Sequence, residues 1–362
     1  MVCLCHNLLL LRPVGVQGDS MEAQDRSNQR EPRQAAVNQP GVRAELDPDA
    51  ALLRAIAEAA PENPLHTPAF AHAQRLRGRR IVAFLVAAAQ AAHVGCTGFI
   101  AQGRLHRDLE IPSAPAAEPD HPIWEAIGQF CSDTGVTRLR VQSLGSQNLR
   151  IPCLGRTLSR SARREYVMDL RTALQSAAFS SNHRRNVRRA QRSGICMAET
   201  ADPTASETHV GLIDSSMSRR QEKGEQASTG TAPDSFRCLL QAGAGVIFQA
   251  RTPEGAVVSS LLVLLSERGA YYHSAGTSPE GMRSGASQFL VAKAAELLRG
   301  RGMDVFNLGG AAAEQDGLAR FKLGFGATPV ELEAASFDVA SGPRRGAVAI
   351  ANGLRSFLRQ ST

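Results

Sequence analysis

The segment from Ser180 to Gly194 carries the residue types best suited to binding an anion, because it holds five arginines and no acidic residue. The five are Arg184, Arg185, Arg188, Arg189 and Arg192. A helix capped by a serine at its start would gather them within roughly 140° of arc, at about 100° per residue. A charge run is usually a solvated face, but like charges without acidic partners repel one another, and an external anion relieves that repulsion. We therefore predict that Arg184, Arg185 and Arg188 line an interdomain cleft and hold phosphate or carboxylate of a substrate.

A second candidate anion site lies where a small-residue loop, Thr277 to Ser284, enters a helix expected from Gly285 to Arg301. Strands expected at 271–276 and 303–308 flank this helix, and a strand–helix–strand unit makes the two strands parallel neighbours. Backbone amides at a helix N-terminus favour an anion, and small residues allow close approach. The residues expected at this site are Arg283, Ser284, Gly285, Ala286 and Ser287. The alternative is an ordinary turn before an ordinary helix.

Length and composition limit the classes of protein to which this chain can belong. The 362 residues suffice for two domains, and 43% hydrophobic with 21% charged residues is typical of a globular protein. The net charge of +7 favours anionic partners such as nucleotides, nucleic acid or an anionic envelope surface. Seven cysteines without a CxxC pair indicate neither a zinc site nor a disulfide framework. We expect a cytoplasmic protein without a transmembrane segment, with peripheral membrane association as an alternative.

The order of expected elements indicates two α/β domains. Residues 1–44 are expected to be disordered, because the stretch from Gly18 to Arg43 is polar and poor in large apolar side chains. Helices and strands then alternate through a first domain, 45–165, which ends in a linker from Ser143 to Arg164. A second domain at 166–340 contains both candidate anion sites, and 341–362 is expected to be a basic tail. Each domain is expected to be built on its own mixed sheet.

Several motifs together resemble a known family. In chain order they are Arg184-Arg185-Asn186 with Arg188-Arg189-Ala190, the apolar strand 257–265, Asn307-Leu308-Gly309-Gly310, and Phe321-Lys322-Leu323-Gly324-Phe325-Gly326. This order resembles the Fem-like branch of the GNAT acyltransferases, over about residues 46–340. The polysaccharide-associated type is the more similar one, since no inserted helical hairpin is evident. The resemblance implies two tandem GNAT-like domains, with acyl-CoA or aminoacyl-tRNA as donor. The segment Glu280 to Ala286 matches only part of the acyl-CoA signature, so the donor stays open.

The resemblance also implies roles for single residues. Lys322 is expected to stabilise the negative oxygen that forms during acyl transfer, and the alternative is a surface lysine. His273 lies on the strand expected to line the cleft and is a candidate base, although a strand histidine is more often structural. Tyr272 on the same strand and Phe321 beside the lysine are candidate substrate contacts. No spacing of histidine, cysteine and acidic residues suggests a metal.

Three classes of function follow from these sites. The first is acyl or aminoacyl transfer to an amine or hydroxyl of an envelope polysaccharide or peptidoglycan precursor. The second is a non-catalytic GNAT-like module that binds a nucleotide-linked sugar or a polysaccharide synthase complex. The third is nucleic-acid binding, which we disfavour because only 5% of residues are aromatic and base stacking has little support.

Overall fold

The computed structural model describes residues 37–39, 41–87, 93–103, 106–144, 150–172, 179–222, 224, 233–311 and 316–340. Its first half contains β1 (Val37–Gln39), β2 (Val42–Leu46), α1 (Ala50–Ala59), the 3-10 helix η1 (Pro64–His66), α2 (Pro68–Leu76), β3 (Arg80–Val86), β4 (Val94–Gln102), β5 (Arg107–Ile111), α3 (Pro122–Thr134) and β6 (Arg138–Gln142). Its second half contains β7 (Arg156–Asp169), α4 (Ser181–Arg192), β8 (Cys196–Thr200), α5 (Ala205–Glu222), α6 (Pro233–Gln241), β9 (Gly245–Arg251), β10 (Val257–Leu265), β11 (Gly269–Thr277), α7 (Pro279–Ser284), α8 (Ala286–Gly300), β12 (Val305–Gly310), α9 (Asp316–Leu323) and β13 (Thr328–Asp338).

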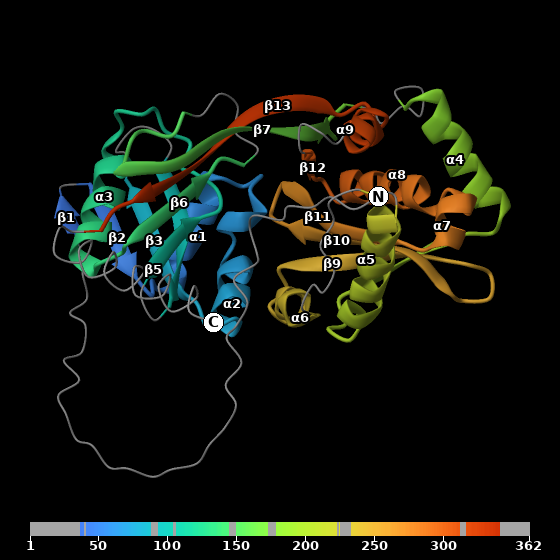
Figure 1. Ribbon diagram of the computed structural model, residues 1–362, viewed down its shortest axis with the longest axis horizontal. Coiled ribbons are helices and arrows are strands. Elements are labelled where there is room, and N and C mark those ends of the chain that lie inside the picture. The colour runs from blue at the N-terminus through green and yellow to red at the C-terminus, as the bar shows by residue number, and fades with distance from the viewer. Residues whose placement is uncertain are drawn as a thin grey trace, which may run out of the picture.

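The strands of the described residues form one sheet in the order β1-β2-β3-β4-β5-β6-β13-β7-β12-β11-β10-β9-β8. Two neighbouring pairs, β5 with β6 and β11 with β12, are parallel, and the other pairs are antiparallel. Each parallel pair is joined by a helical crossover, α3 in the first half and α7–α8 in the second. The two halves therefore repeat one plan about the seam between β13 and β7 (Figure 1).

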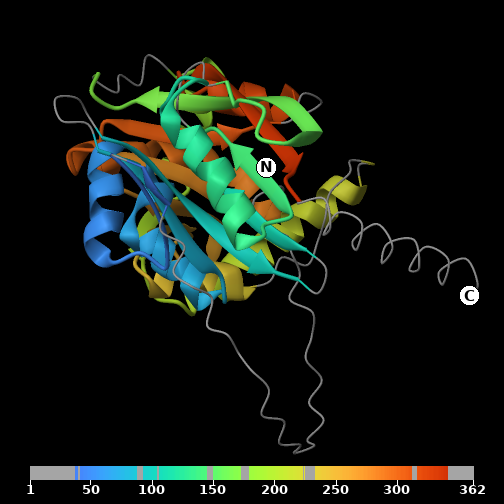
Figure 2. The same cartoon turned by 90° about the vertical axis from the view of Figure 1, so that its left-hand side faces the viewer.

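Each half has its own hydrophobic core. The first-half core packs α3 on the sheet through side chains such as Phe84, Ile127 and Phe130, and Figure 2 shows this half from its outer side. The second-half core lies under α8 and includes Phe248, Tyr272 and Phe306. The prediction of two cores is confirmed, but that of two separate sheets is wrong, because β7 and β13 run across both halves.

A third cluster, the shared core, joins the two halves. It packs Phe70 of α2 and Phe99 of β4 against Phe236 of α6 and Tyr271 of β11. The rings of Phe70 and Phe99 meet edge to face, with centroids 5.6 Å apart. Apolar side chains from both halves thus exclude water from the contact between them, which fixes the halves relative to each other.

Strand β7 begins inside the linker predicted from Ser143 to Arg164, so the second part of that segment is a strand and not a linker. The expected domain boundary at residue 165 also lies inside β7. The arginine-rich run is extended because β13 pairs along its whole length. Carboxylates on β13 face the arginines of β7, with Arg164 on Glu331 and Arg160 on Glu333. These partners lie more than 160 residues away in the chain, so local composition could not indicate them.

The chain ends differ in part from the prediction. Within the segment expected to be disordered, Val37–Gln39 and Val42–Leu46 form a strand pair, so regular structure begins before residue 45. The expected basic tail at 341–362 lies outside the described residues. Among the residues that are described, no helix has the length and apolar character needed to cross a bilayer.

Candidate functional site

Helix α4 presents its arginines on an open face. The Ser180 hydroxyl caps the helix by accepting from the amide of His183, and His183 and Ala190 turn inward and are buried. The outward side chains surround a hollow of about 720 Å³. Its lining residues are Ser181, Arg184, Arg185, Arg188, Gln191 and Arg192. We call this the arginine hollow.

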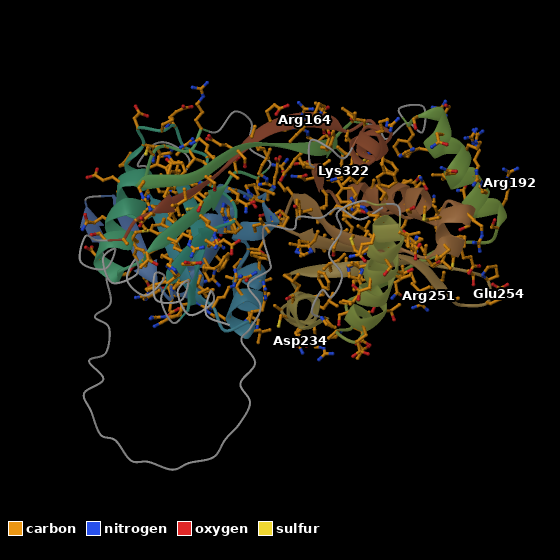
Figure 3. The ribbon with its side chains drawn as sticks, viewed as in Figure 1. Arg164, Arg192, Asp234, Arg251, Glu254 and Lys322 are labelled. Atoms are coloured by element: carbon orange, nitrogen blue, oxygen red, sulfur yellow. The ribbon has the colours of Figure 1, made fainter. Side chains whose placement is uncertain are left out.

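The arginine hollow is not between the two halves, as the sequence had led us to expect. Helix α4 packs on α7 and α8 at the outer end of the second half, where Arg192 is labelled in Figure 3. The predicted interdomain location is therefore wrong, because the shared core rather than α4 fills the contact between the halves. Among the described residues, no carboxylate pairs with Arg188 or Arg192. Arg184 donates to the carbonyl of Phe179, and Arg185 donates to Asn182 at 2.9 Å.

The predicted loop before α8 is a short helix, α7, because Ser278 caps it and Pro279 begins it. Gly285 separates α7 from α8 with φ of 80°, a left-handed conformation that favours glycine. A Cβ at this position would lie 2.6 Å from the carbonyl oxygen of Asn186 in α4. The small residue therefore permits the close contact between α4 and the start of α8.

The two candidate anion sites lie side by side. The Arg189 guanidinium of α4 donates to the carbonyl of Arg283 in α7 at 2.9 Å, next to the start of α8. Among the predicted donor-site residues, Arg283 is exposed, Ser284 and Ser287 are half-buried, and Ala286 is buried. Within the described ranges, no side chain caps the N-terminus of α8. Helix α4 thus contacts the start of α8 through Arg189 and Asn186, whereas the side chains that line the arginine hollow all belong to α4.

His183 connects α4 to the Phe321–Gly326 segment, and sequence reasoning missed it. Its Nε2 donates to the carbonyl of Phe321 at 2.8 Å, and its ring meets that of Phe325 with centroids 4.4 Å apart. A Cβ on Gly324 would lie 2.6 Å from the imidazole, so only glycine leaves room for the ring. Burial lowers the pKa of His183, which favours the neutral form. The available signal was its spacing of seven residues from Ala190, which puts both on one helix face.

Lys322 is fully buried, so the alternative of a surface lysine is wrong. Its ammonium donates to the carbonyl of Gly310 and lies 5.8 Å from the centre of the Tyr166 ring. Phe321 and Tyr272, the two predicted substrate contacts, both pack in the second-half core.

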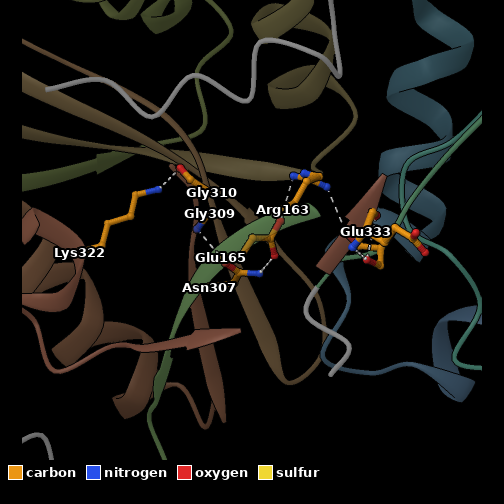
Figure 4. A network of polar contacts seen from close by, with 8 residues as sticks. Arg163, Glu165, Asn307, Gly309, Gly310, Lys322 and Glu333 are labelled. Atoms are coloured by element: carbon orange, nitrogen blue, oxygen red, sulfur yellow. Dashed lines mark hydrogen bonds and ion pairs between the residues drawn. The ribbon is translucent and has the colours of Figure 1, made fainter. Parts of the chain in front are cut away.

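A polar network surrounds the end of β12 near Lys322 (Figure 4). Asn307 donates to Glu165 at 2.7 Å and accepts from the amide of Gly309 at 2.7 Å. Glu165 also accepts from Arg163 at 3.2 Å and has no exposed surface. Sequence reasoning noted Asn307 only as part of a motif and missed Glu165, because its acidic side chain lies at the end of a run read as a linker.

His273 lies on the face of the sheet that carries Tyr271 and the shared core, opposite to the second-half core of Tyr272, and a bulge in β11 follows Tyr272. Leu262 of β10 pairs with Ser274 and Val263 pairs with Tyr272, which leaves His273 as an extra residue. As a result His273 and Ser274 both face α5 and α6, where His209 lies 2.8 Å from the Ser274 hydroxyl. Burial, and next the charge of Arg77, lower the pKa of His273 to about 4. The predicted catalytic pair therefore lies on opposite faces of the sheet.

The strands β11 and β12 separate from each other partway along their length. They pair at only three positions, ending at Tyr271 with Asn307, although β11 continues to Thr277 and β12 to Gly310. Where a parallel pair diverges, backbone groups of the two strands can bind partners other than each other. Within the described part of the chain, no group of histidine, cysteine and acidic side chains could hold a metal ion.

Comparison with known proteins finds a family model that matches part of the chain and solved structures of similar fold. Residues 177–327 match the family model of the acetyltransferase (GNAT) domain. A search of curated proteins found no match. Among solved structures, a crystal structure of FemX matches with a TM-score of 0.57 at 11% identity, covering 78% of this chain and 94% of that one. A conserved protein of unknown function from Bacteroides thetaiotaomicron VPI-5482 matches with a TM-score of 0.51 at 10% identity, covering 79% and 95%.

These matches confirm the predicted α/β fold class and the resemblance to Fem-like GNAT proteins. The chain carries a GNAT-type acyltransferase domain, which extends from just before α4 to the end of the Phe321–Gly326 segment. The arginine hollow, the start of α8 and Lys322 all lie inside it.

Proposed function

We propose that the protein transfers an acyl or aminoacyl group to an amine or hydroxyl of an envelope polysaccharide or peptidoglycan precursor. The observation that carries this proposal is the direct connection between the arginine hollow and the Lys322 helix. Ser180 donates its amide to the carbonyl of Gly324 at 2.8 Å, and His183 holds Phe321. An anion bound on α4 is thereby coupled to the helix that carries the buried ammonium.

The donor's phosphates are proposed to bind in the arginine hollow of α4. Arginine suits this role because its planar fork pairs bidentately with phosphate and stays charged. Either acyl-CoA or aminoacyl-tRNA supplies such phosphates. The fold shared with FemX supports the aminoacyl alternative, and the GNAT domain supports acyl-CoA. We place the reaction in the cytoplasm, where both donors are made.

The chemical step is a nucleophilic displacement at the donor's carbonyl carbon. The acceptor nitrogen or oxygen attacks this carbon, and the carbonyl oxygen becomes negative. The leaving group then departs with its electron pair as the carbonyl re-forms, and it takes up the proton that the acceptor loses. Lys322 is proposed to stabilise the negative oxygen. Its ammonium must then exchange the Gly310 carbonyl for the oxyanion when the donor binds.

The alternative is a non-catalytic module that binds a nucleotide-linked sugar or a synthase complex. One observation favours it: Lys322 has no exposed surface and already donates to Gly310. In that case the ammonium only holds the β12 turn against α9, and the arginine hollow is the whole functional site.

Turnover with a panel of acyl-CoA and aminoacyl-tRNA donors separates the two functions. If the proposal is right, Lys322→Met should lower turnover about 10²-fold with little change in donor affinity. Lys293→Met, which removes a half-exposed lysine of α8, is the matched control. Transfer by the Lys322→Met protein at the wild-type rate would assign the lysine a structural role.

Donor binding tests the arginine hollow separately. The double variant Arg188→Gln and Arg192→Gln should weaken binding of CoA and of tRNA and reduce its dependence on salt. Arg156→Gln on β7 removes an exposed arginine far from α4 and is the control. Unchanged affinity in the double variant would show that the phosphates bind elsewhere.

A further inference from the structure

Glu165 is a buried carboxylate with a defined set of donors. Its Oε1 accepts from Arg163 at 3.2 Å and its Oε2 accepts from Asn307 at 2.7 Å. The other arm of Arg163 donates to the carbonyl of Ser143, so the arginine cannot easily turn away (Figure 4). A buried carboxylate is stable only where such donors are fixed in place.

The carboxylate determines which way the Asn307 amide points. Glu165 can only accept, so Asn307 must turn its NH₂ group toward it and its Oδ1 toward the amide of Gly309. The reverse orientation would bring two donors together at Gly309 and two acceptors together at Glu165. A neutral side chain at position 165 would no longer favour one of the two orientations of the Asn307 amide.

The Asn307 oxygen in turn holds a bulge at the end of β12. Asn307 pairs with Val167 and Gly310 pairs with Glu165, so β12 has one residue more than β7 in this interval. Gly309 accommodates the extra residue with φ of 73°. A side-chain oxygen that accepts from the backbone two residues later stabilises such a turn.

The residues that hold the bulge lie on both faces of the sheet. Phe306 and Leu308 belong to the second-half core, so Asn307 points to the opposite face. Lys322 comes from α9 on the core side and donates to the carbonyl of Gly310, the residue after the bulge. The orientation of that carbonyl is therefore set from the far face, through Asn307 and Glu165.

We propose that Glu165 and Asn307 are positioning residues for Lys322. The negative charge at Glu165 fixes the Asn307 amide, the amide fixes the Gly309 bulge, and the bulge places the Gly310 carbonyl that holds the ammonium. The catalytic significance rests on the proposed acyl transfer, whereas the positioning of the lysine does not depend on it.

An exchange of the two polar groups tests the proposal. In Glu165→Gln, the new NH₂ group meets a donor from either Arg163 or Asn307. In Asn307→Asp, two carboxylates face each other. In the double variant, the new amide at position 165 donates to the new carboxylate at position 307, while the amide oxygen accepts from Arg163. The new carboxylate still accepts from Gly309, so the double variant restores each hydrogen bond with the charge moved by one side chain.

The rate at which Lys322 is acetylated by a chemical reagent reports how well its ammonium is held in place, and this measurement needs no enzymatic turnover. The chain has only three lysines, Lys223, Lys293 and Lys322, so acetic anhydride labelling followed by mass spectrometry resolves each one. Both single variants should raise the labelling rate of Lys322 relative to Lys293 about tenfold, the order expected for an unsatisfied buried group. The double variant should return the ratio to within about twofold of the wild type.

Glu331→Gln is the matched control, because it removes a carboxylate of β13 that is 59% exposed. Where a donor is turned over, the single variants should lower kcat with KM unchanged, and should have no further effect in the Lys322→Met background. The proposal is overturned if both single variants leave Lys322 as protected as in the wild type, or if the double variant labels as fast as the singles. If no donor is turned over, the proposed function fails while the labelling still decides the positioning.

Discussion

His209 should make the stability of the protein sensitive to mild acid. It is fully buried between α5 and the sheet, with Nδ1 2.5 Å from the Ser260 hydroxyl and Nε2 2.8 Å from that of Ser274. Burial, and next the charge of His273, lower its pKa from 6.5 to about 3. The unfolded chain therefore takes up a proton on lowering the pH well before the folded chain does.

The magnitude follows from these two values. Because the folded-state pKa is the lower one, the contribution of His209 is complete above pH 6.5 and is lost as the pH falls toward about 3. Between pH 7 and pH 5 the free energy of unfolding should fall by about 2 kcal/mol from this residue alone. His273, whose pKa is lowered to about 4, should contribute a similar loss.

Urea unfolding followed by circular dichroism at several pH values tests the reasoning. His209→Gln keeps a donor and an acceptor between the two serines but cannot take up a proton, so its free energy of unfolding should fall about 2 kcal/mol less between pH 7 and pH 5. His72→Gln changes an exposed histidine of α2 and should behave as the wild type. An equal fall in wild type and His209→Gln would refute the assignment.

Three further substitutions test the packing that supports the site. Gly285→Val should destabilise the protein by about 1–3 kcal/mol, because its Cβ would overlap the α4 backbone and the residue has a positive φ; urea unfolding measures this, and an unchanged midpoint would contradict it. Gly324→Ala should separate the Lys322 helix from α4 by displacing the His183 ring, seen as faster hydrogen exchange in α4. Arg79→Met should lower the free energy of unfolding by about 3–5 kcal/mol, because it removes the guanidinium that lies 2.8 Å from the buried carboxylate of Glu110. A loss below about 1 kcal/mol would mean that water replaces the arginine.

Elements defined by local sequence were predictable. The start of α4 at its serine cap, the long helix after β11 and the apolar strand β10 all lie close to their expected bounds, since capping and hydrophobic period act within one segment. The parallel pairing of β11 and β12 is also confirmed, because a strand–helix–strand unit permits little else.

The site depended on contacts that local sequence does not encode. Glu165 is paired with Asn307, 142 residues further on, and nothing in its neighbourhood distinguishes it from other acidic residues beside arginines. The bulge at His273 puts His273 and Ser274 on the same face of the sheet, which strict alternation along a strand cannot foresee. Gly285 was predicted as a donor-binding residue, and its contact with the backbone of α4 was not predictable.

The position of β13 has a consequence for synthesis on the ribosome. This last strand lies between β6 and β7, and the contact between Ser143 and Glu333 spans 190 residues of chain. At about 5–20 residues per second, the two flanking strands wait roughly 10–40 s for their partner. During that interval the nascent chain exposes two unpaired strand edges, which are templates for pairing with other chains. We expect yield to depend on the protection of these edges by chaperones, and translation stalled before Thr328 to produce aggregates.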